Sequence, residues 1–221
     1  EKKGYKFKTK TDTEMILALY SEYGEKSFSM LRGMFAFGLW DDKNKKLFLV
    51  KDRYGIKPLY YFSDTEKLVF ASTVKAITGS GLIPVVKNPK AYIGFLLFGS
   101  VPLPMTTIKD VFAIPAGNYL VREADGRQKL VQYYDSLEFF HNKNNISFGK
   151  AAENVKQLLD KSINYHLISD APLGVFLSGG LDSSVVAALA AQSRKNPITT
   201  LSIIFDEPEF SEQKYQRLVA Q

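Results

Sequence analysis

The sequence predicts two regions of different fold class, an α+β region followed by an α/β region. In the first two thirds of the 221 residues, short apolar runs alternate with turn residues, which is typical of antiparallel hairpins. In the last third, an apolar run, a glycine turn and a helix-forming segment follow one another, as they do at the start of a parallel sheet. The polar, aperiodic stretch His141–Ser147 lies between the two patterns. We therefore expect one domain in residues 1–140 and a second in residues 141–221.

Composition excludes several classes of function. The chain has no Cys and two His, which rules out a disulfide framework and a cysteine nucleophile within it and argues against a catalytic zinc site. The net charge of +6 is spread along the chain, so no nucleic-acid partner is expected. The apolar run Ile93–Met105 is too short to span a bilayer, and the first residues lack the apolar core of a secretory signal. We expect a cytoplasmic protein with no membrane partner.

The first region reads as hairpins with a helix on one side. Thr11 and Glu14 have the spacing of a capping box, and Gly24 suits a helix end, so a helix is predicted over Thr11–Tyr23. Asp125-Gly126 predicts the turn of a late hairpin. The other expected elements are a buried strand Gly33–Trp40, strands Leu47–Val50, Leu59–Phe62 and Leu68–Ala71, helices Ser72–Thr78 and 91–99, and strands Gly117–Arg122 and Lys129–Tyr134.

The second region reads as the beginning of a doubly wound sheet. Apolar residues recur every four positions in Lys150–Ser169, which predicts an amphipathic helix. The nearly continuous apolar run Thr200–Phe205 predicts a buried strand parallel to the run Val175–Leu177. A parallel sheet that is covered on both faces needs more than two strands, so we expect the chain to be a fragment of a longer protein.

The loop between that first strand and the next helix has the composition of an anion site. Ser178-Gly179-Gly180 separates the apolar run from a segment rich in Ala and Leu. A helix amino terminus presents unpaired N–H groups, and adjacent glycines let the backbone approach a phosphate closely. Ser183 and Ser184 add hydroxyl donors, and Asp182 suits a Mg²⁺ ion that arrives with the phosphates.

Three other interpretations of the same loop fit its residues less well. A P-loop needs Lys and Ser/Thr where Gly180 and Leu181 stand. A nucleophile elbow needs Gly where Phe176 stands and a His later in the chain, whereas His141 and His166 both come earlier. An ordinary turn without a ligand does not account for two Gly, several Ser and one Asp at a single helix start.

The string SGGLDS resembles the PP-loop of the ATP pyrophosphatases, and APLGVFLSGGLDSSVVAALA resembles the asparagine synthetase branch of that group. The resemblance implies ATP as a substrate, with Mg²⁺ held by Asp182. In the family, backbone positions that correspond to Leu177 and Ile203 line the adenine pocket, although both residues also suit a plain strand core. The ATP-binding residues that the resemblance implies are Leu177, Ser178, Gly179, Gly180, Asp182, Ser183 and Ile203.

The strings KTKTDTEMILALY, LRGMFAFGLWD, VKDRYGIKPLYYF and IPAGNYL resemble, in this order, the glutamine amidotransferase domain of the N-terminal-nucleophile (Ntn) type. The resemblance implies an antiparallel Ntn-type sandwich and places the α-amino group of glutamine at Asp12, whose alternative role is to cap the helix. Arg53, Gly55 and Pro58 match a turn motif that we interpret as structural, with Arg53 pairing a buried acid.

Together the motifs resemble glutamine-hydrolysing asparagine synthetase, a ligase that binds glutamine, aspartate and ATP. The resemblance places the cysteine nucleophile before residue 1, so no catalytic residue is expected in this chain, and residues 1–221 alone should neither hydrolyse glutamine nor make asparagine. A homodimer is one open alternative for the assembly. Other open readings are an amidotransferase for a surface sugar acid, a β-lactam-forming synthetase and a non-catalytic nucleotide-binding scaffold. A nucleic-acid-modifying PP-loop enzyme would leave the antiparallel region unexplained.

Overall fold

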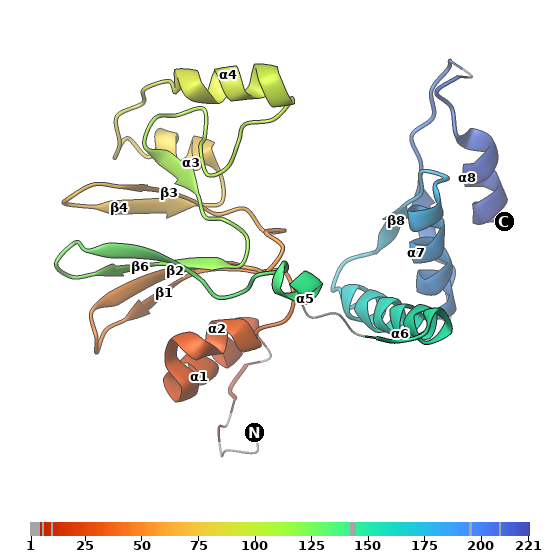
Figure 1. Ribbon diagram of the computed structural model, residues 1–221, viewed down its shortest axis with the longest axis horizontal. Coiled ribbons are helices and arrows are strands. Elements are labelled where there is room, and N and C mark those ends of the chain that lie inside the picture. The colour runs from red at the N-terminus through yellow and green to blue at the C-terminus, as the bar shows by residue number, and fades with distance from the viewer. Residues whose placement is uncertain (1–4, 6, 10, 142–144, 195, 208) are drawn as a thin grey trace. The chain divides into compact units, whose positions relative to one another are not determined.

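The computed structural model describes residues 5, 7–9, 11–141, 145–194, 196–207 and 209–221. The chain forms two compact units, unit 1 (Glu1–Asn142) and unit 2 (Lys143–Gln221) (Figure 1). Of the expected linker, residues 142–144 lie outside the described residues. His141 ends a short helix, α5 (Glu138–His141), and Ser147 is the N-cap of the next helix, with its Oγ accepting a hydrogen bond from Lys150 N. The irregular stretch is therefore shorter than predicted.

Unit 1 contains a four-stranded antiparallel sheet in the order β1-β2-β6-β7. Its strands are β1 (Ala36–Asp41), β2 (Lys46–Lys51), β6 (Asn118–Glu123) and β7 (Gln128–Gln132). The predicted hairpins on either side of the central pair are confirmed. The prediction of a buried strand at Gly33–Trp40 is wrong in its burial, because β1 is an edge strand in which only Leu39 is buried and Trp40 is 53% exposed.

A second antiparallel sheet in unit 1 has the order β4-β3-β5. Its strands are β3 (Tyr60–Ser63), β4 (Leu68–Ala71) and β5 (Val111–Ala113). The hairpin of β3 and β4 is confirmed, whereas β5 was not predicted. With three residues, β5 has too short an apolar pattern to predict a strand, and it is defined by its pairing with β3.

The two sheets stack face to face, which confirms the predicted antiparallel sandwich (Figure 1). Leu49 and Leu120 of the first sheet pack in one cluster with Leu59 and Ile114, which flank the second. Strand side chains point alternately to opposite faces, so Phe48 and Val50, which neighbour Leu49, point to the outer face of the first sheet.

Helices cover both outer faces of the sandwich. The first sheet packs against α1 (Asp12–Tyr23) and α2 (Ser27–Met30), which are joined by the short 3₁₀ helix η1 (Gly24–Lys26). The second sheet packs against α3 (Val74–Gly79) through Ile77. The prediction of a helix on one side only is therefore wrong, because the helix that begins near Ser72 buries its apolar residues against the opposite sheet.

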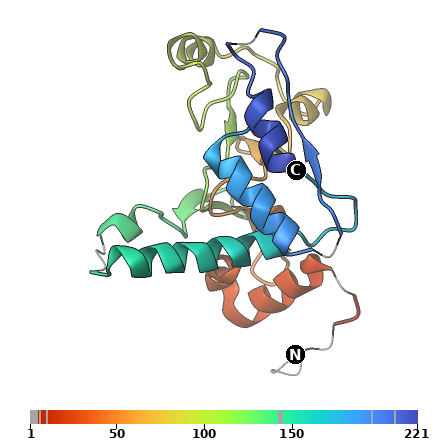
Figure 2. The same ribbon diagram turned by 90° about the vertical axis from the view of Figure 1, so that its right-hand side faces the viewer.

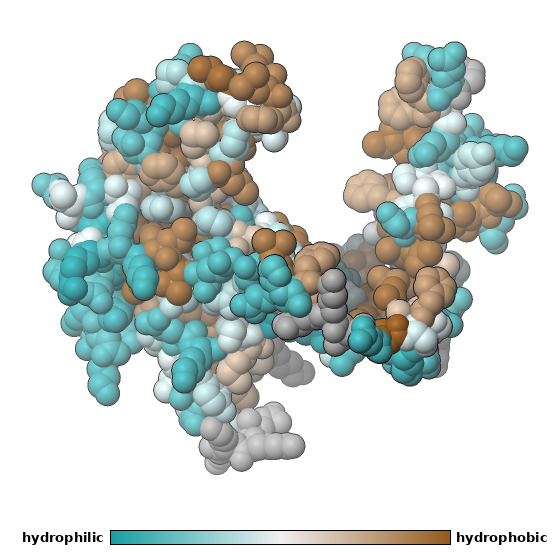
Figure 3. Space-filling model, in the orientation of Figure 1, coloured by the Kyte–Doolittle hydropathy of each residue, from teal (hydrophilic) through white to brown (hydrophobic). Residues whose placement is uncertain are grey.

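In helix α4 (Pro89–Phe98) most of the apolar side chains are exposed. Leu96, Leu97 and Phe98 are 70–82% exposed, and Figure 3 shows hydrophobic surface at this corner of unit 1. The predicted short apolar helix at 91–99 is confirmed. Among the described residues, no helix is both long enough and apolar enough to cross a membrane.

Unit 2 begins with α6 (Phe148–His166), followed by β8 (Gly174–Phe176), α7 (Leu181–Gln192), β9 (Thr199–Leu201) and α8 (Gln213–Ala220). β8 and β9 pair in parallel, which confirms the predicted strand–helix–strand unit. The strand predicted over Thr200–Phe205 is shorter than expected and is not buried, since Ile203, Ile204 and Phe205 are 52–70% exposed. Its ladder ends where β8 turns into the loop.

Candidate functional site

The loop after β8 leads directly into the amino terminus of α7. Gly180 is the N-cap of α7 with an extended backbone, and its carbonyl accepts hydrogen bonds from Ser184 N (3.1 Å) and Ser184 Oγ (2.7 Å). The first N–H groups of a helix have no intrahelical acceptor and carry a partial positive charge. The strand–turn–helix that the sequence predicted is therefore present, and its turn exposes the kind of donors that bind anions.

Two serine hydroxyls and two backbone N–H groups meet in this loop. Ser178 Oγ and Ser183 Oγ lie 2.9 Å apart, and Ser183 Oγ accepts a hydrogen bond from Ser178 N at 3.2 Å. Gly180 N donates to Ser178 Oγ at 3.3 Å. Hydroxyl protons can rotate, so the same groups can donate to a phosphate oxygen instead of to each other.

Gly179 has a backbone conformation and surroundings that disfavour a side chain. Its φ of +89° is in the region that L residues rarely adopt. A Cβ atom there would lie 3.1 Å from Tyr215 Cβ and 3.3 Å from Gln216 N in α8. Figures 1 and 2 both show α8 close to α7, in agreement with these short distances between α8 and the loop.

Asp182 is the second residue of α7 and is exposed. Among the described residues, no group of three or more His, Cys, Asp or Glu side chains is placed to hold a metal ion. A single carboxylate is enough for Mg²⁺, which usually takes one or two protein carboxylates and fills its other positions with phosphate oxygens and water. Asp182, at the start of α7, offers one such carboxylate.

Leu177 and Ile203 have different surroundings. Leu177 is 2% exposed, and its backbone joins the loop to β9, because its N donates to Leu201 O and its O accepts from Ser202 Oγ, both at 2.8 Å. Ile203 lies beyond the end of β9 and is 70% exposed. The structure thus brings Leu177, Ser178, Gly179, Gly180 and Ser183 together in one loop, with Ile203 on the neighbouring segment.

Asp12 is the first residue of α1 and is exposed. The N-cap position belongs to Thr11, whose side chain makes no capping hydrogen bond. The predicted capping box is therefore not formed. Glu14 instead accepts hydrogen bonds from Lys8 N and Thr9 N at 2.8 and 2.7 Å, and these bonds lower the pKa of its carboxyl group.

The turn after β2 is organised by Asp52, which is fully buried. Its carboxylate accepts hydrogen bonds from the backbone N–H groups of Tyr54, Ile56 and Lys57 at 2.9–3.1 Å. The prediction that Arg53 pairs a buried acid is wrong, because its guanidinium donates to Ser29 O at 2.7 Å and lies over a tyrosine ring. Backbone N–H groups already satisfy the buried acid, and none of the ion pairs between described residues involves Arg53.

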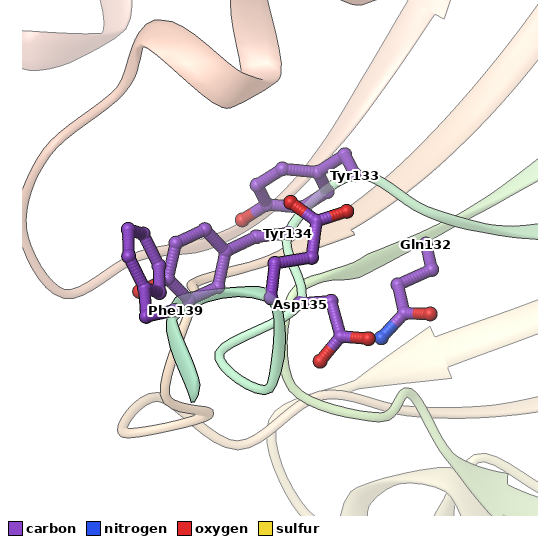
Figure 4. Close-up of a pocket in the computed structure, with 6 residues that line it drawn as sticks. Gln132, Tyr133, Tyr134, Asp135 and Phe139 are labelled. Atoms are coloured by element: carbon purple, nitrogen blue, oxygen red, sulfur yellow. The ribbon is translucent and has the colours of Figure 1, made fainter. Parts of the chain in front are cut away.

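A small cavity of about 210 Å³ is lined in part by Tyr134, the tyrosine whose ring lies under the guanidinium of Arg53. Figure 4 shows Gln132, Tyr133, Tyr134, Asp135 and Phe139 around it. Tyr133 Oη donates to Lys51 O at 2.6 Å, and burial raises the pKa of its hydroxyl. No residue of this cavity was predicted to bind a ligand.

Sequence reasoning missed one polar residue beside the loop, Gln216. It is 5% exposed, and its amide contacts both the loop and the segment after β9. A glutamine in a polar, charged helix gives no signal of burial, so only the tertiary structure reveals it.

The comparisons with known proteins divide the chain at a similar place. Residues 1–134 match the family model described as glutamine amidotransferase domain, and residues 154–221 match that of asparagine synthase. Over 96% of its length the chain is 34% identical to asparagine synthetase [glutamine-hydrolyzing] 1 of Bacillus subtilis, covering 33% of that protein. It is 35% identical over 85% of its length to amidase chry2 of Gibberella zeae, covering 27% of that protein.

Among solved structures, glutamine phosphoribosylpyrophosphate amidotransferase from B. subtilis aligns with a TM-score of 0.38 at 21% identity, covering 95% of this chain and 43% of that one. The chain spans about a third or less of the length of the two relatives named above. More than half of the chain matches the amidotransferase model, and its two sheets have the stacking expected from the sequence. The chain therefore belongs to the glutamine amidotransferase domain family, joined to a segment that matches asparagine synthase.

Proposed function

We propose that the whole protein is an ATP-dependent, glutamine-hydrolysing asparagine synthetase. In this proposal residues 1–140 belong to the domain that releases ammonia from glutamine, and residues 141–221 belong to the domain that binds ATP. The side-chain carboxylate of aspartate attacks the α-phosphate of ATP, which gives β-aspartyl-AMP and pyrophosphate. Ammonia then displaces AMP and gives asparagine. A cytoplasmic location follows from the proposal, because its three substrates are cytoplasmic metabolites.

The observation that carries the proposal is the geometry of the loop after β8. The two hydroxyls of Ser178 and Ser183 lie 2.9 Å apart at the amino terminus of α7. Donors arranged in advance stabilise the negative charge that grows on the leaving pyrophosphate without reorganising during the reaction. A Mg²⁺ ion on Asp182 would add positive charge at the same phosphates.

The role of Asp182 is tested by Asp182→Asn in the whole protein. We expect pyrophosphate release from ATP and aspartate to be lost, while glutamate release from glutamine continues, because the change removes the carboxylate at the loop only. Asp170→Asn is the matched control, since Asp170 is exposed and precedes β8, whereas the loop follows it. Pyrophosphate release at the normal rate by Asp182→Asn would contradict the metal role.

The role of Asp12 is tested by comparing synthesis driven by glutamine with synthesis driven by added ammonium. We propose that its carboxylate holds the α-amino group of glutamine, which suits its exposed position at the start of α1. Asp12→Asn should reduce glutamine-driven synthesis about ten- to a hundredfold, the loss of one charged contact of roughly 1.5–3 kcal/mol. Synthesis driven by added ammonium should stay normal. An equal fall in both reactions would mean that Asp12 supports the fold instead.

A second candidate keeps the two reactions and changes the acceptor. It is favoured by the relative named as an amidase, which is 35% identical to the chain over 85% of its length, against 34% over 96% for the relative named as an asparagine synthetase. The two candidate functions are distinguished by measuring AMP formation from ATP by the whole protein, with aspartate and with other carboxylic acids. AMP formation that needs aspartate supports asparagine synthesis, AMP formation with another acid alone supports the second candidate, and ATP binding without pyrophosphate release would indicate a nucleotide-binding scaffold.

A further inference from the structure

Gln216 is a buried polar residue that the proposed reaction does not use. It lies in the middle of α8 and is 5% exposed, although the exposed fractions of its neighbours Tyr215 and Leu218 are 57% and 71%. A polar side chain is buried at a cost unless hydrogen bonds compensate for it. The contacts of Gln216 therefore show what its burial achieves.

The side-chain amide of Gln216 joins two backbone segments of the candidate site. Its Nε2 donates to Ser178 O, in the loop, at 3.3 Å and to Ile203 O, beyond β9, at 3.2 Å. Both acceptors are carbonyl oxygens, which fixes the orientation of the amide, because its oxygen in the same place would face two other oxygens. Gln216 Oε1 is then buried without a hydrogen-bond partner among the described residues.

The same helix also closes over the backbone of Gly179. Gln216 N lies 3.3 Å from the position that a Cβ of Gly179 would take. The loop is thus held on one side by the ladder from Leu177 to Leu201 and on the other by α8. A buried Oε1 without a partner costs free energy. The side chain bears this cost while its two N–H groups hold the loop, which indicates that the position of the loop matters.

We propose that Gln216 is a positioning residue for ATP, which ties the phosphate-binding loop to the segment expected to line the adenine pocket. This inference rests on the proposed function, because it assigns the loop and Ile203 to ATP. Gln216 does not touch the reacting atoms. Its two hydrogen bonds set the distance between the part of the site that binds phosphates and the part that binds the base.

The test compares Gln216→Met with a matched control, Gln192→Met, in the whole protein. Met fills a similar volume without donating a hydrogen bond, and Gln192 is an exposed residue in the last turn of α7. We expect Gln216→Met to raise the Kd of Mg·ATP about tenfold, the loss of two buried hydrogen bonds, and Gln192→Met to leave it unchanged. The KM for glutamine in the glutaminase reaction should not change in either variant.

A second variant, Gln216→Glu, separates positioning from packing. At pH 8 an ionised carboxylate would face two carbonyl oxygens, whereas at pH 6 the protonated group, whose pKa burial raises, can donate one hydrogen bond. We expect its Kd for Mg·ATP to approach that of the unchanged protein at pH 6. Glu212 and Arg217 on the same helix are common to both proteins, so their contribution cancels in the comparison.

The outcomes are distinguishable. Binding of Mg·ATP by Gln216→Met as tightly as by the unchanged protein overturns the inference and leaves the proposed function standing. No binding of Mg·ATP by the unchanged protein overturns the proposed function and this inference with it. Should Gln216→Met not fold, Gln216→Glu decides, and a ratio of its Kd to that of the unchanged protein that is equal at pH 6 and pH 8 contradicts a positioning role.

Discussion

The two units bury their apolar residues to very different extents. Unit 1 has three buried clusters, one between its sheets and one against the helices on each outer face, and Phe28 and Phe48 in it are 0% exposed. Among its described residues, unit 2 has one cluster of three buried residues, Ile163, Leu189 and Ala190, between α6 and α7. Close packing therefore determines the shape of unit 1, while hydrogen bonds from β9 and α8 determine the position of the loop in unit 2.

Because of this difference, the residues that stabilise the fold lie mainly in unit 1, while the candidate site lies in unit 2. Side chains packed in a core resist change, since moving one disturbs its neighbours. A loop held by a few polar contacts opens at a smaller free-energy cost and is stabilised by whatever binds it. We therefore expect unit 1 to respond to core substitutions and unit 2 to respond to ATP.

The largest expected effect is in the core of unit 1. Phe28 contacts the rings of Tyr20, Phe37, Phe48 and Tyr119. Phe28→Ala should lower the free energy of unfolding by about 3–5 kcal/mol. Urea unfolding of residues 1–221 measures it through the fluorescence of Trp40, the single tryptophan of the chain, which lies in unit 1. Phe98→Ala, at a residue of unit 1 that is 71% exposed, is the control. Similar losses for both variants would refute the comparison.

The next effect concerns ATP and unit 2. Binding to the folded state stabilises it, by about 2.7 kcal/mol at a hundredfold excess of ligand over Kd. In the whole protein, Mg·ATP should slow hydrogen exchange of the backbone amides of α7 by up to about a hundredfold and leave those of β2 unchanged. Mass spectrometry of the two segments measures this. Equal protection of β2 would show that the two units do not respond independently.

A smaller effect is expected from the backbone of the loop itself. Gly179→Ala places a Cβ at φ +89° and against α8, which costs about 1–2 kcal/mol in the left-handed region alone. The Kd of Mg·ATP should rise roughly tenfold. Gly149→Ala, in α6 with nothing within 4 Å of the added Cβ, should instead stabilise unit 2 by about 0.5–1 kcal/mol. Calorimetry compares the two, and unchanged ATP binding by Gly179→Ala would contradict the role of the loop.

The smallest effect tests the surface of unit 1. Hydrogen bonds from Asn44 and Tyr20 lower the pKa of Asp41 to about 2. A carboxyl pKa that folding lowers stabilises the folded state above the ordinary value of 3.8, and this contribution is lost as the pH falls toward 2. Asp41→Asn should therefore make stability depend less on pH between 4 and 2. A carboxyl NMR titration of Asp41 with a midpoint near 3.8 would disprove the lowered pKa.

The sequence by itself determined the elements whose signals are local. The run Val175–Leu177, the glycine pair and the Ala-rich segment were sufficient to predict a strand, a turn and a helix. The Asp125-Gly126 turn likewise predicted the hairpin of β6 and β7. These predictions succeeded because glycine conformation and helix termini depend on adjacent residues.

Only the tertiary structure decided what each element packs against. It placed α3 on the sheet opposite to α1, made β1 an edge strand and paired the three residues of β5 with β3. It also buried Gln216 between two carbonyl groups 38 and 13 residues away in the chain. Contacts of this kind join segments distant in sequence, so no local pattern records them, and the packing of the whole unit selects them.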